Sequence, residues 1–391
     1  MVAVAKRFTH SSFNEALATI RGATPAAAFY TLPTPAELHS LYRFGFRGIR
    51  PENATHEQKD NYKTLMAAMP RLYDVFPWAR GLGKGKLSLP YLAVLKFSPT
   101  WGGDEAQTRG SCTVHSTANS GEVDHANDAA FGETKYMGRL VKENIYRSRG
   151  FSSDGWSCTA PATYVGPTGR GGFLYRKLYT GPNGEKVDFT KFSRDTENWA
   201  GNGRAGVPKW LEEESAKNKA KWIIPITTME EYRDAIALGF GISICSGQGF
   251  SATTDEYGVA MPEGSWSHAM AHAGCDDRPW AHTKYGDLIG LDIQSWGRWN
   301  KQNGMPEGVK TMPIGSFWIK ANTIANKMLG EDDVAICNVY GWERAGWEAF
   351  DTLELKKHLA NSTTQDYYKN RAEKIEDLAV RAYDENLFLA I

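Results

Sequence analysis

Two stretches late in the chain, SHAMAHAG and LIGLDIQ, constrain the fold more than any other part of the sequence. Their residues alternate with the period of two that is typical of β-strands. A turn-rich linker, CDDRPWAHTKYGD, separates them, so we expect the two strands to pair antiparallel. A register that places Gly274 opposite Leu288 also places His268 opposite Gln294. The start of one strand would then meet the end of the other.

Helical patterns occupy much of the rest of the chain. They include a stretch that begins at Cys112 and runs through TVHSTANSGEVDHANDAAF, a second that ends at Gly150, and a third, TMEEYRDAIALG, that ends at Gly239 and leads into the strand GISICS. Thr228 and Glu231 have the spacing of a capping box at the start of the third helix. The chain also holds 39 glycines and 17 prolines, and its aromatic content is 12%. These features predict a loop-rich α+β fold.

Composition excludes several functions. The 45 basic residues balance the 45 acidic ones, and there is no basic stripe of the kind that binds nucleic acid through phosphates. No run of 18 apolar residues predicts a membrane span, and MVAVAKRFTH does not have the pattern of a signal peptide. We therefore expect no nucleic-acid or membrane partner and a cytoplasmic or virion-associated protein. Its five cysteines, an odd number, are expected to be free thiols.

The sharpest local signal for chemistry is QTRGSCT, where Cys112 opens a predicted helix. The unpaired N–H groups and the dipole of a helix N-terminus stabilise a thiolate, which is the nucleophilic form of cysteine. The same N–H groups can hold the oxyanion of a tetrahedral intermediate, and the side-chain amide of Gln107 is a candidate for a second donor. A base and a group that orients it are then needed. The paired strands supply His268 and Gln294.

In this respect the sequence resembles the papain-like cysteine peptidases, and in its wider texture the bacterial and phage members. The matching motifs are QTRGSC, SHAMAHAGC and QSWGRW, in the order in which that family has them, within roughly residues 90 to 345. The resemblance implies an α+β papain-like fold of two subdomains, one helical and one a barrel-like antiparallel sheet. It also implies a polypeptide substrate and no cofactor.

Carried over to this sequence, the resemblance makes Cys112 the nucleophile, His268 the general acid/base and Gln107 the oxyanion donor, with Trp296 shielding the partner of the histidine. The sequence departs from the family at two points. Gln107 lies five positions before the cysteine where the family usually has six, and Gln294 stands where the family has Asn. Asp292, on the same strand face, is an alternative group to orient the histidine.

Other interpretations stay open. His268, His272 and Cys275 could be zinc ligands, although no fourth ligand has a clear spacing. GQGFSA superficially matches a dinucleotide-binding pattern, but the residues after it do not predict a helix. A different class of function is a structural or assembly protein, for instance in a phage particle, that keeps the scaffold and cuts poorly or not at all.

The sequence divides into three expected regions. Residues 1–88 form a helical segment that could be a pro-segment or bind a protein partner, 89–345 the peptidase core, and 346–391 a helical tail that offers a second surface for partners. The loops of residues 150–206 are expected to line the substrate cleft.

Overall fold

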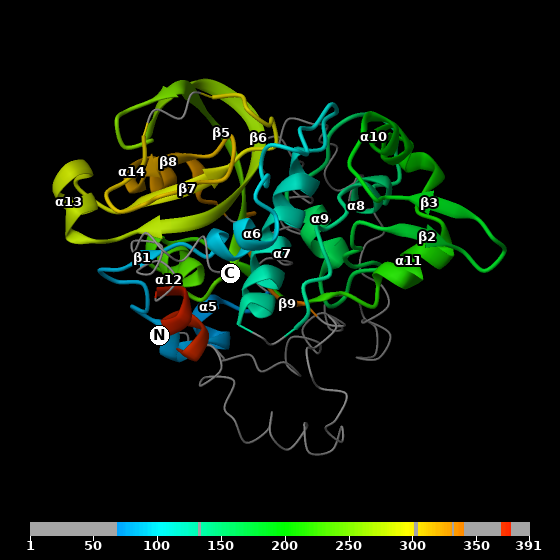
Figure 1. The fold of residues 1–391 in the computed structure, drawn as a ribbon, viewed down its shortest axis with the longest axis horizontal. Coiled ribbons are helices and arrows are strands. Elements are labelled where there is room, and N and C mark those ends of the chain that lie inside the picture. The colour runs from blue at the N-terminus through cyan, green and yellow to red at the C-terminus, as the bar shows by residue number, and fades with distance from the viewer. Residues whose placement is uncertain (1–68, 132–133, 301–303, 331, 340–368, 377–391) are drawn as a thin grey trace, which may run out of the picture.

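The computed structural model describes residues 69–131, 134–300, 304–330, 332–339 and 369–376. Within these ranges an antiparallel sheet of seven strands lies on one side of the molecule and a group of short helices on the other (Figure 1). The strands run in the order β4-β9-β5-β6-β7-β8, and β1 pairs with β6. The α+β fold predicted from the sequence, with a helical part and an antiparallel part, is confirmed.

The elements have the following bounds. The sheet consists of β1 (Leu87–Ser88), β4 (Ala220–Pro225), β5 (Gly241–Thr254), β6 (Ala260–Asp276), β7 (Ile289–Ile293), β8 (Phe317–Lys320) and β9 (Val334–Val339). A separate pair is formed by β2 (Leu178–Thr180) and β3 (Lys186–Asp188). The helical segments are α5 (Leu72–Val75), η2 (Pro77–Ala79), α6 (Tyr91–Phe97), α7 (Cys112–Ala130), α8 (Glu143–Arg147), α9 (Thr159–Val165), α10 (Arg194–Gly201), η3 (Gly203–Ala205), α11 (Lys209–Ser215), α12 (Met229–Ala237), α13 (Pro279–Tyr285), α14 (Ala321–Thr323) and η4 (Ile324–Met328).

Helix α7 lies at the centre, between the sheet and the helices α8 and α9 (Figure 1). Every residue from Cys112 to Asn127 is buried, so no face of this part of the helix meets solvent. Gly241 allows β5 to approach the helix closely, because a Cβ atom there would lie 2.5 Å from the Cα of Ser120. The central position of α7 fixes its first residue, Cys112, between the two halves of the fold.

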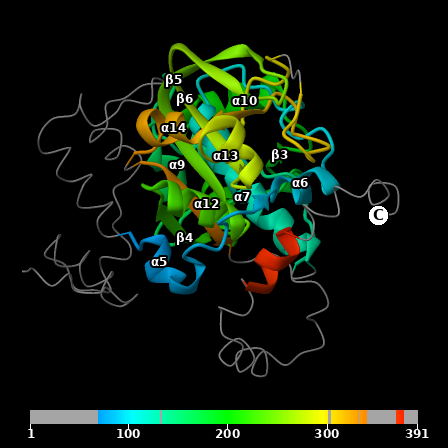
Figure 2. The same cartoon turned by 90° about the vertical axis from the view of Figure 1, so that its left-hand side faces the viewer.

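The sheet carries apolar side chains on both faces. One buried cluster includes Ile244 and Met270, and another includes Ala271 and Leu291. Ile289, Leu291 and Ile293 all lie in the second cluster, as the alternation in LIGLDIQ predicts. The β5–β6 hairpin extends beyond this core and curls over one end of the molecule (Figures 1 and 2).

The helix signals in the sequence correspond to real termini. Thr228 precedes α12 and accepts a hydrogen bond from the N–H of Glu231 at 3.2 Å, although the Glu231 side chain binds Arg71 and not the Thr228 backbone. Gly239 has a φ of 86°, which ends the helix and which other residues rarely adopt. The helix expected to end at Gly150 is shorter than the pattern suggests and covers only α8.

Both flanking regions contact the core where they are described. Leu72 and Phe76 pack in the same cluster as Ile244. Arg371, in the helical segment 369–376 shown in red, binds Asp124 at 2.9 Å and Asp128 at 2.7 Å at the end of α7 (Figure 2). The domain boundaries at 88/89 and 345/346 stay a prediction, and the remainder of both flanks lies outside the described residues.

Candidate active site

Cys112 is the first residue of α7, as predicted, and its side chain is buried. Burial raises the pKa of its thiol to about 11, even though the backbone of Ala269 and of Thr113 acts in the opposite direction. The N–H groups of the first helical turn are thus oriented toward the sulfur, but desolvation of the thiolate is the larger effect. In this conformation Cys112 is a protonated thiol at neutral pH.

His268 and Gln294 meet directly. The Nε2 atom of His268 lies 2.7 Å from Oε1 of Gln294, whose Nε2 donates to the sulfur of Met270 at 3.0 Å. The other ring nitrogen of His268, Nδ1, is buried and has no hydrogen-bond partner among the described residues. Burial lowers the pKa of His268 to about 3, against the opposing effect of the bond to Gln294. The imidazole is therefore neutral, and with Gln294 accepting at Nε2–H, its Nδ1 is free to take a proton.

The strand register that the sequence suggested is wrong. Gly274 pairs with Leu291, not Leu288, and His272 pairs with Asp292. The predicted register would place His272 opposite Gly290, so it was already wrong before the bulge between His272 and Gly274. The bulge adds one more residue to the difference, and bulges leave no clear mark in a period-two pattern. His268 and Gln294 are consequently not directly opposite. The long Gln294 side chain nevertheless reaches His268.

Two tryptophans, Trp296 and Trp266, contact the imidazole, and Trp299 packs against both of them. Trp296 stacks on His268 with ring centroids 4.3 Å apart and planes at 29°. Trp266 and Trp299 meet Trp296 edge to face at 4.9 and 5.7 Å. Trp296 therefore covers one face of the His268 ring, and its shielding of the histidine's partner stays a prediction.

Gln107 lies beside this strand end but its amide is already engaged. Its backbone N–H donates to the carbonyl of Ser295 at 2.8 Å, and its Oε1 accepts from the Ser295 hydroxyl at 2.5 Å. Its side-chain Nε2 donates to the carbonyl of Arg109 at 2.9 Å. The geometry ties Gln107 to the segment that carries Gln294, and its amide would have to leave Arg109 to serve another acceptor.

The alternative residues face elsewhere. Asp292 lies 3.7 Å from Nε2 of His272, whose Nδ1 is 2.9 Å from the hydroxyl of Tyr232. Burial raises the pKa of Asp292 well above its ordinary value. Asp292 is thus the neighbour of His272, not of His268. Among the described residues, the ligand atoms of His268, His272 and Cys275 do not come together in a metal-binding group.

A carboxylate that the sequence did not single out, Glu197 of α10, holds the loop before Cys112. It accepts from the N–H of Thr108 at 2.7 Å, from the Thr108 hydroxyl and from the Ser111 hydroxyl at 2.7 Å. Its Oε1 is 3.9 Å from Nε2 of His115, too far for a direct hydrogen bond. Burial acts to raise the pKa of Glu197, but His115, Thr108 and Ser111 outweigh it and lower that pKa. No sequence motif indicates Glu197, because its contacts with Thr108 and Ser111 depend on how the 150–206 region folds against the loop before Cys112.

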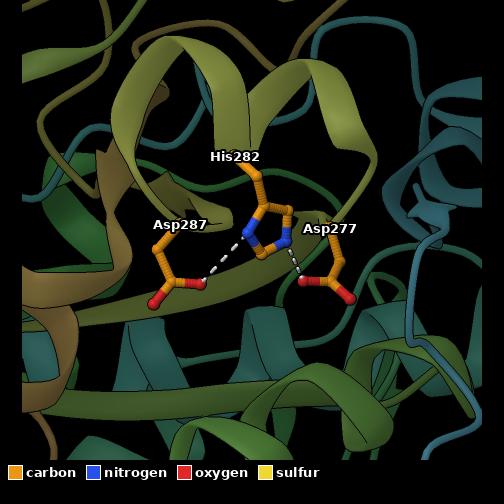
Figure 3. A group of neighbouring side chains, drawn as sticks. All are labelled: Asp277, His282 and Asp287. Carbon is orange, nitrogen blue, oxygen red and sulfur yellow. Dashed lines mark hydrogen bonds and ion pairs between the residues drawn. The ribbon is translucent and has the colours of Figure 1, made fainter.

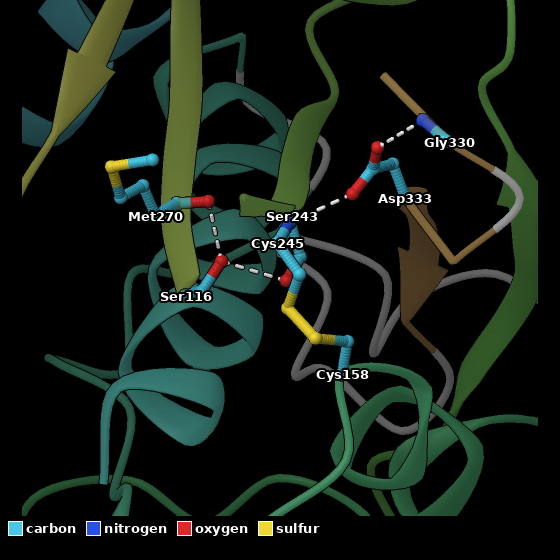
Figure 4. The surroundings of a disulfide bond; sticks show 7 residues. All are labelled: Ser116, Cys158, Ser243, Cys245, Met270, Gly330 and Asp333. Carbon is cyan, nitrogen blue, oxygen red and sulfur yellow. Dashed lines mark hydrogen bonds between the residues drawn. A yellow bond between two sulfur atoms is a disulfide. The ribbon is translucent and has the colours of Figure 1, made fainter. Parts of the chain in front are cut away.

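The cysteines are not all free thiols, which corrects the expectation from the sequence. Cys158 and Cys245 form a disulfide, while Cys112, Cys275 and Cys337 are free and buried (Figure 4). The two bonded cysteines are 87 positions apart, with Cα atoms 6.0 Å apart. A linear spacing of this size says nothing about pairing, since only the fold brings the N-terminus of α9 to β5.

A second group of polar side chains lies away from Cys112. In Figure 3 the imidazole of His282 lies between the carboxylates of Asp277 and Asp287, at 2.8 and 3.8 Å. Ligand atoms of these three residues all fall within 4.8 Å of one another, beside a pocket of about 400 Å³ that Arg233 also lines. The side chains satisfy one another, and the Arg233 guanidinium, 3.9 Å from Asp277, disfavours a cation.

Comparisons with known proteins give structural likenesses only. No family model matches the sequence, and no curated protein matches it. The chain is similar to xylellain, a cysteine protease from Xylella fastidiosa, at 13% identity over 71% of this chain and 89% of that one, with a TM-score of 0.39. It is also similar to the cysteine protease and lectin-like domains of Cwp84 from Clostridium difficile at 14% identity over 61% of this chain and 49% of that one, with a TM-score of 0.39. Digestive procathepsin L2 from Tenebrio molitor matches at 14% identity over 62% of this chain and 66% of that one, with a TM-score of 0.35.

Likenesses at this level of identity and TM-score carry no argument about function. The functional conclusion therefore rests on the contacts of the chain's own residues. One further observation concerns membranes: in the part of the chain that the structure describes, no helix combines the length and the apolar character that a bilayer span requires.

Proposed function

We propose that this chain is a papain-like cysteine peptidase in which Cys112 is the nucleophile and His268 the general acid/base. The observation that carries the proposal is the His268–Gln294 hydrogen bond of 2.7 Å on Nε2, which leaves Nδ1 buried and unpaired among the described residues. A histidine oriented through one nitrogen, with the other free, is what proton transfer to and from a nucleophile requires. Cys112 packs against Ala269, the residue that follows His268.

The sequence of steps uses these groups alone. The Cys112 sulfur attacks the peptide carbonyl carbon after its proton passes to Nδ1 of His268. The carbon–nitrogen bond then breaks, His268 gives the proton to the leaving amine, and a thioester remains. Water attacks the thioester while His268 takes its proton, and return of that proton to sulfur frees the acid and restores the thiol.

The oxyanion would be held at the N-terminus of α7. The N–H of Cys112 is one donor, since the first N–H groups of a helix have no partner within it. The side-chain amide of Gln107 is the second, after it exchanges the Arg109 carbonyl for the oxyanion. Its fixed backbone bond to Ser295 keeps it next to the site during that exchange.

Hydrolysis of a fluorescent casein by the reduced full-length chain tests the proposal. Cys112→Ala and His268→Ala should lose cleavage, while the controls Cys275→Ala and His282→Ala should keep it. Catalysis requires a state in which Cys112 is exposed and paired with His268. In the reduced chain, alkylation of Cys112, located by peptide mass, should therefore be fast well below the ordinary thiol pKa of about 8.5 and become slow in His268→Ala. A Cys112→Ala protein that cleaves at the wild-type rate would exclude this mechanism.

No contact in the described part of the chain favours the alternative of a catalytically inactive assembly protein. Casein hydrolysis that is absent from the reduced wild type, together with alkylation of Cys112 that simply follows an ordinary thiol titration, would favour it.

A further inference from the structure

The Cys158–Cys245 disulfide joins the two halves of the fold next to the candidate nucleophile. Cys158 is the residue before α9 on the helical side, and Cys245 lies in β5 of the sheet. Figure 4 shows the bond crossing from the strand to the helix start, beside α7.

The disulfide packs directly on the active-site residues. Cys112, Cys158, Cys245 and Ala269 form one buried cluster. Cys245 is also the register partner of Ala269, the neighbour of His268. Exposure is 2% for Cys112 and 1% for His268, against 6% and 7% for Cys158 and Cys245. The two bonded cysteines are thus slightly more exposed than Cys112, the candidate nucleophile in the same cluster.

This arrangement does not suit catalysis. A peptide carbonyl has to reach within about 3–3.5 Å of the Cys112 sulfur before attack. Here the sulfur is covered, and the same burial raises the pKa of Cys112 to about 11 and lowers that of His268 to about 3. The oxidised form therefore holds a neutral thiol and a neutral imidazole, and both side chains are buried.

We propose that the Cys158–Cys245 disulfide is a redox latch: a thiol reductant cleaves it, the segment that leads into α9 moves away from β5, and Cys112 becomes accessible to a polypeptide. The latch rests on the function proposed above. A reductant thiolate attacks one sulfur of the bond, forms a mixed disulfide and releases the other cysteine. A second reductant thiol then resolves the mixed disulfide, so that the protein gains two electrons and two protons and the reductant becomes a disulfide.

The surroundings indicate which side moves. The backbone N–H of Cys245 donates to Asp333 at 2.8 Å, and Asp333 also accepts from Gly330 at 2.6 Å (Figure 4). β5 is further paired with both β6 and β9. Cys158 is not in a strand and makes no side-chain cap for α9, whereas α9 itself packs against β4 and β9. Release of the bond therefore frees the segment before α9 more than it frees the sheet.

The protonation state of Cys112 also prevents Cys112 itself from reducing the Cys158–Cys245 disulfide. Attack on the neighbouring disulfide would require the Cys112 thiolate. With the pKa of Cys112 near 11, that species is scarce at neutral pH. An external thiol, such as a dithiol of ordinary pKa, is the effective reductant.

The test compares Cys112 alkylation by iodoacetamide at pH 7 in the full-length chain, purified without reductant, before and after treatment with dithiothreitol. Peptide mass first establishes the Cys158–Cys245 cross-link and then locates the modified cysteine. We expect alkylation of Cys112 to be at least about tenfold faster after reduction. The double variant Cys158→Ala/Cys245→Ala should react fast without reductant, and Cys275→Ala should behave as the wild type.

Equal rates before and after reduction in the wild type would overturn the latch, and so would the absence of the cross-link from protein held under oxidising conditions. If the double variant does not fold, by far-UV circular dichroism, the wild-type pair of measurements decides alone. Casein hydrolysis separates the two proposals. Fast alkylation on opening without cleavage would refute the peptidase and keep the latch, whereas cleavage at one rate in both redox forms would keep the peptidase and refute the latch.

Discussion

Replacement of Glu197 tests whether the loop before Cys112 has to be held in place for reaction. Glu197 accepts three hydrogen bonds: two of 2.7 Å, from the Thr108 N–H and the Ser111 hydroxyl, and one from the Thr108 hydroxyl. Hydrogen bonds to a charged group contribute about 1.5–3 kcal/mol each. Both Thr108 donors bind Oε2, so Glu197→Gln can keep that oxygen as the acceptor while its amide group replaces Oε1 and loses the Ser111 bond. The free energy of unfolding should then fall by about 1.5–3 kcal/mol, and by more in Glu197→Ala, which loses all three bonds.

The same substitution should slow the chemistry, because a displacement of about 1 Å in a reacting group can cost a hundredfold in rate. In the reduced protein we expect Glu197→Gln to lower the rate of Cys112 alkylation and of casein hydrolysis by about ten- to a hundredfold. Asp195→Asn is the matched control, since it removes the same charge from an exposed position of the same helix.

The pH dependence of stability tests whether the negative charge of Glu197 is what stabilises the loop. The folded pKa of Glu197 is lowered, so its contribution to stability is full above the ordinary carboxyl pKa of about 4.3 and is lost as the pH falls through the folded pKa. Urea unfolding should show a constant deficit for Glu197→Gln from pH 7 down to about 5, and a shrinking one below about 4.3. A Glu197→Gln protein that matches Asp195→Asn in both stability and rate would refute this reasoning.

Three further changes have expected outcomes. Gln294→Asn should lower the alkylation rate of Cys112 in the reduced protein, because the shorter side chain cannot span to His268 from its register position; an unchanged rate and pH profile would show that this bond is dispensable. Ser116→Ala should cost about 1–3 kcal/mol in urea unfolding, since Ser116 bonds the Ser243 hydroxyl at 2.7 Å and the Met270 carbonyl at 2.6 Å. The double variant with Ser243→Ala should cost less than the sum of the two single changes, whereas strict additivity would mean that the hydroxyls do not interact. Arg371→Ala should cost about 3–5 kcal/mol, because it leaves two carboxylates without their buried cation, and a cost below 1 kcal/mol would show that the segment 369–376 does not dock on α7.

The parts of the site that could be predicted from the sequence are those governed by local pattern. Helix start signals placed Cys112 at the N-terminus of α7, and alternation predicted the strand β6 that carries His268 and the strand β7 that Gln294 follows. The contact between His268 and Gln294 was predicted from a register that proved wrong by more than the one residue that the bulge in β6 accounts for. The Gln294 side chain still reaches His268, at 2.7 Å.

What local pattern could not supply depends on segments that meet only in the folded chain. The disulfide requires α9 and β5 to be adjacent, and the expectation of free thiols failed for that reason. Glu197 acts on Thr108 and Ser111 from nearly ninety positions away, across a region in which the sequence predicted only loops. The side-chain amide of Gln107 bonds to a carbonyl two residues on, which a motif spacing does not reveal.

Helix α7, which is buried on every side through Asn127, also bears on how the chain folds. A helix that has no solvent-facing side needs packing partners on all of its faces. The sheet covers only part of α7 and the helical group covers another part, so neither one alone can bury it. The two halves should therefore gain and lose structure together, and a fragment containing only one of them should not hold α7. Backbone amides in the middle of α7 should exchange with deuterium only through global unfolding, which makes this helix the natural reporter of cooperativity in the whole molecule.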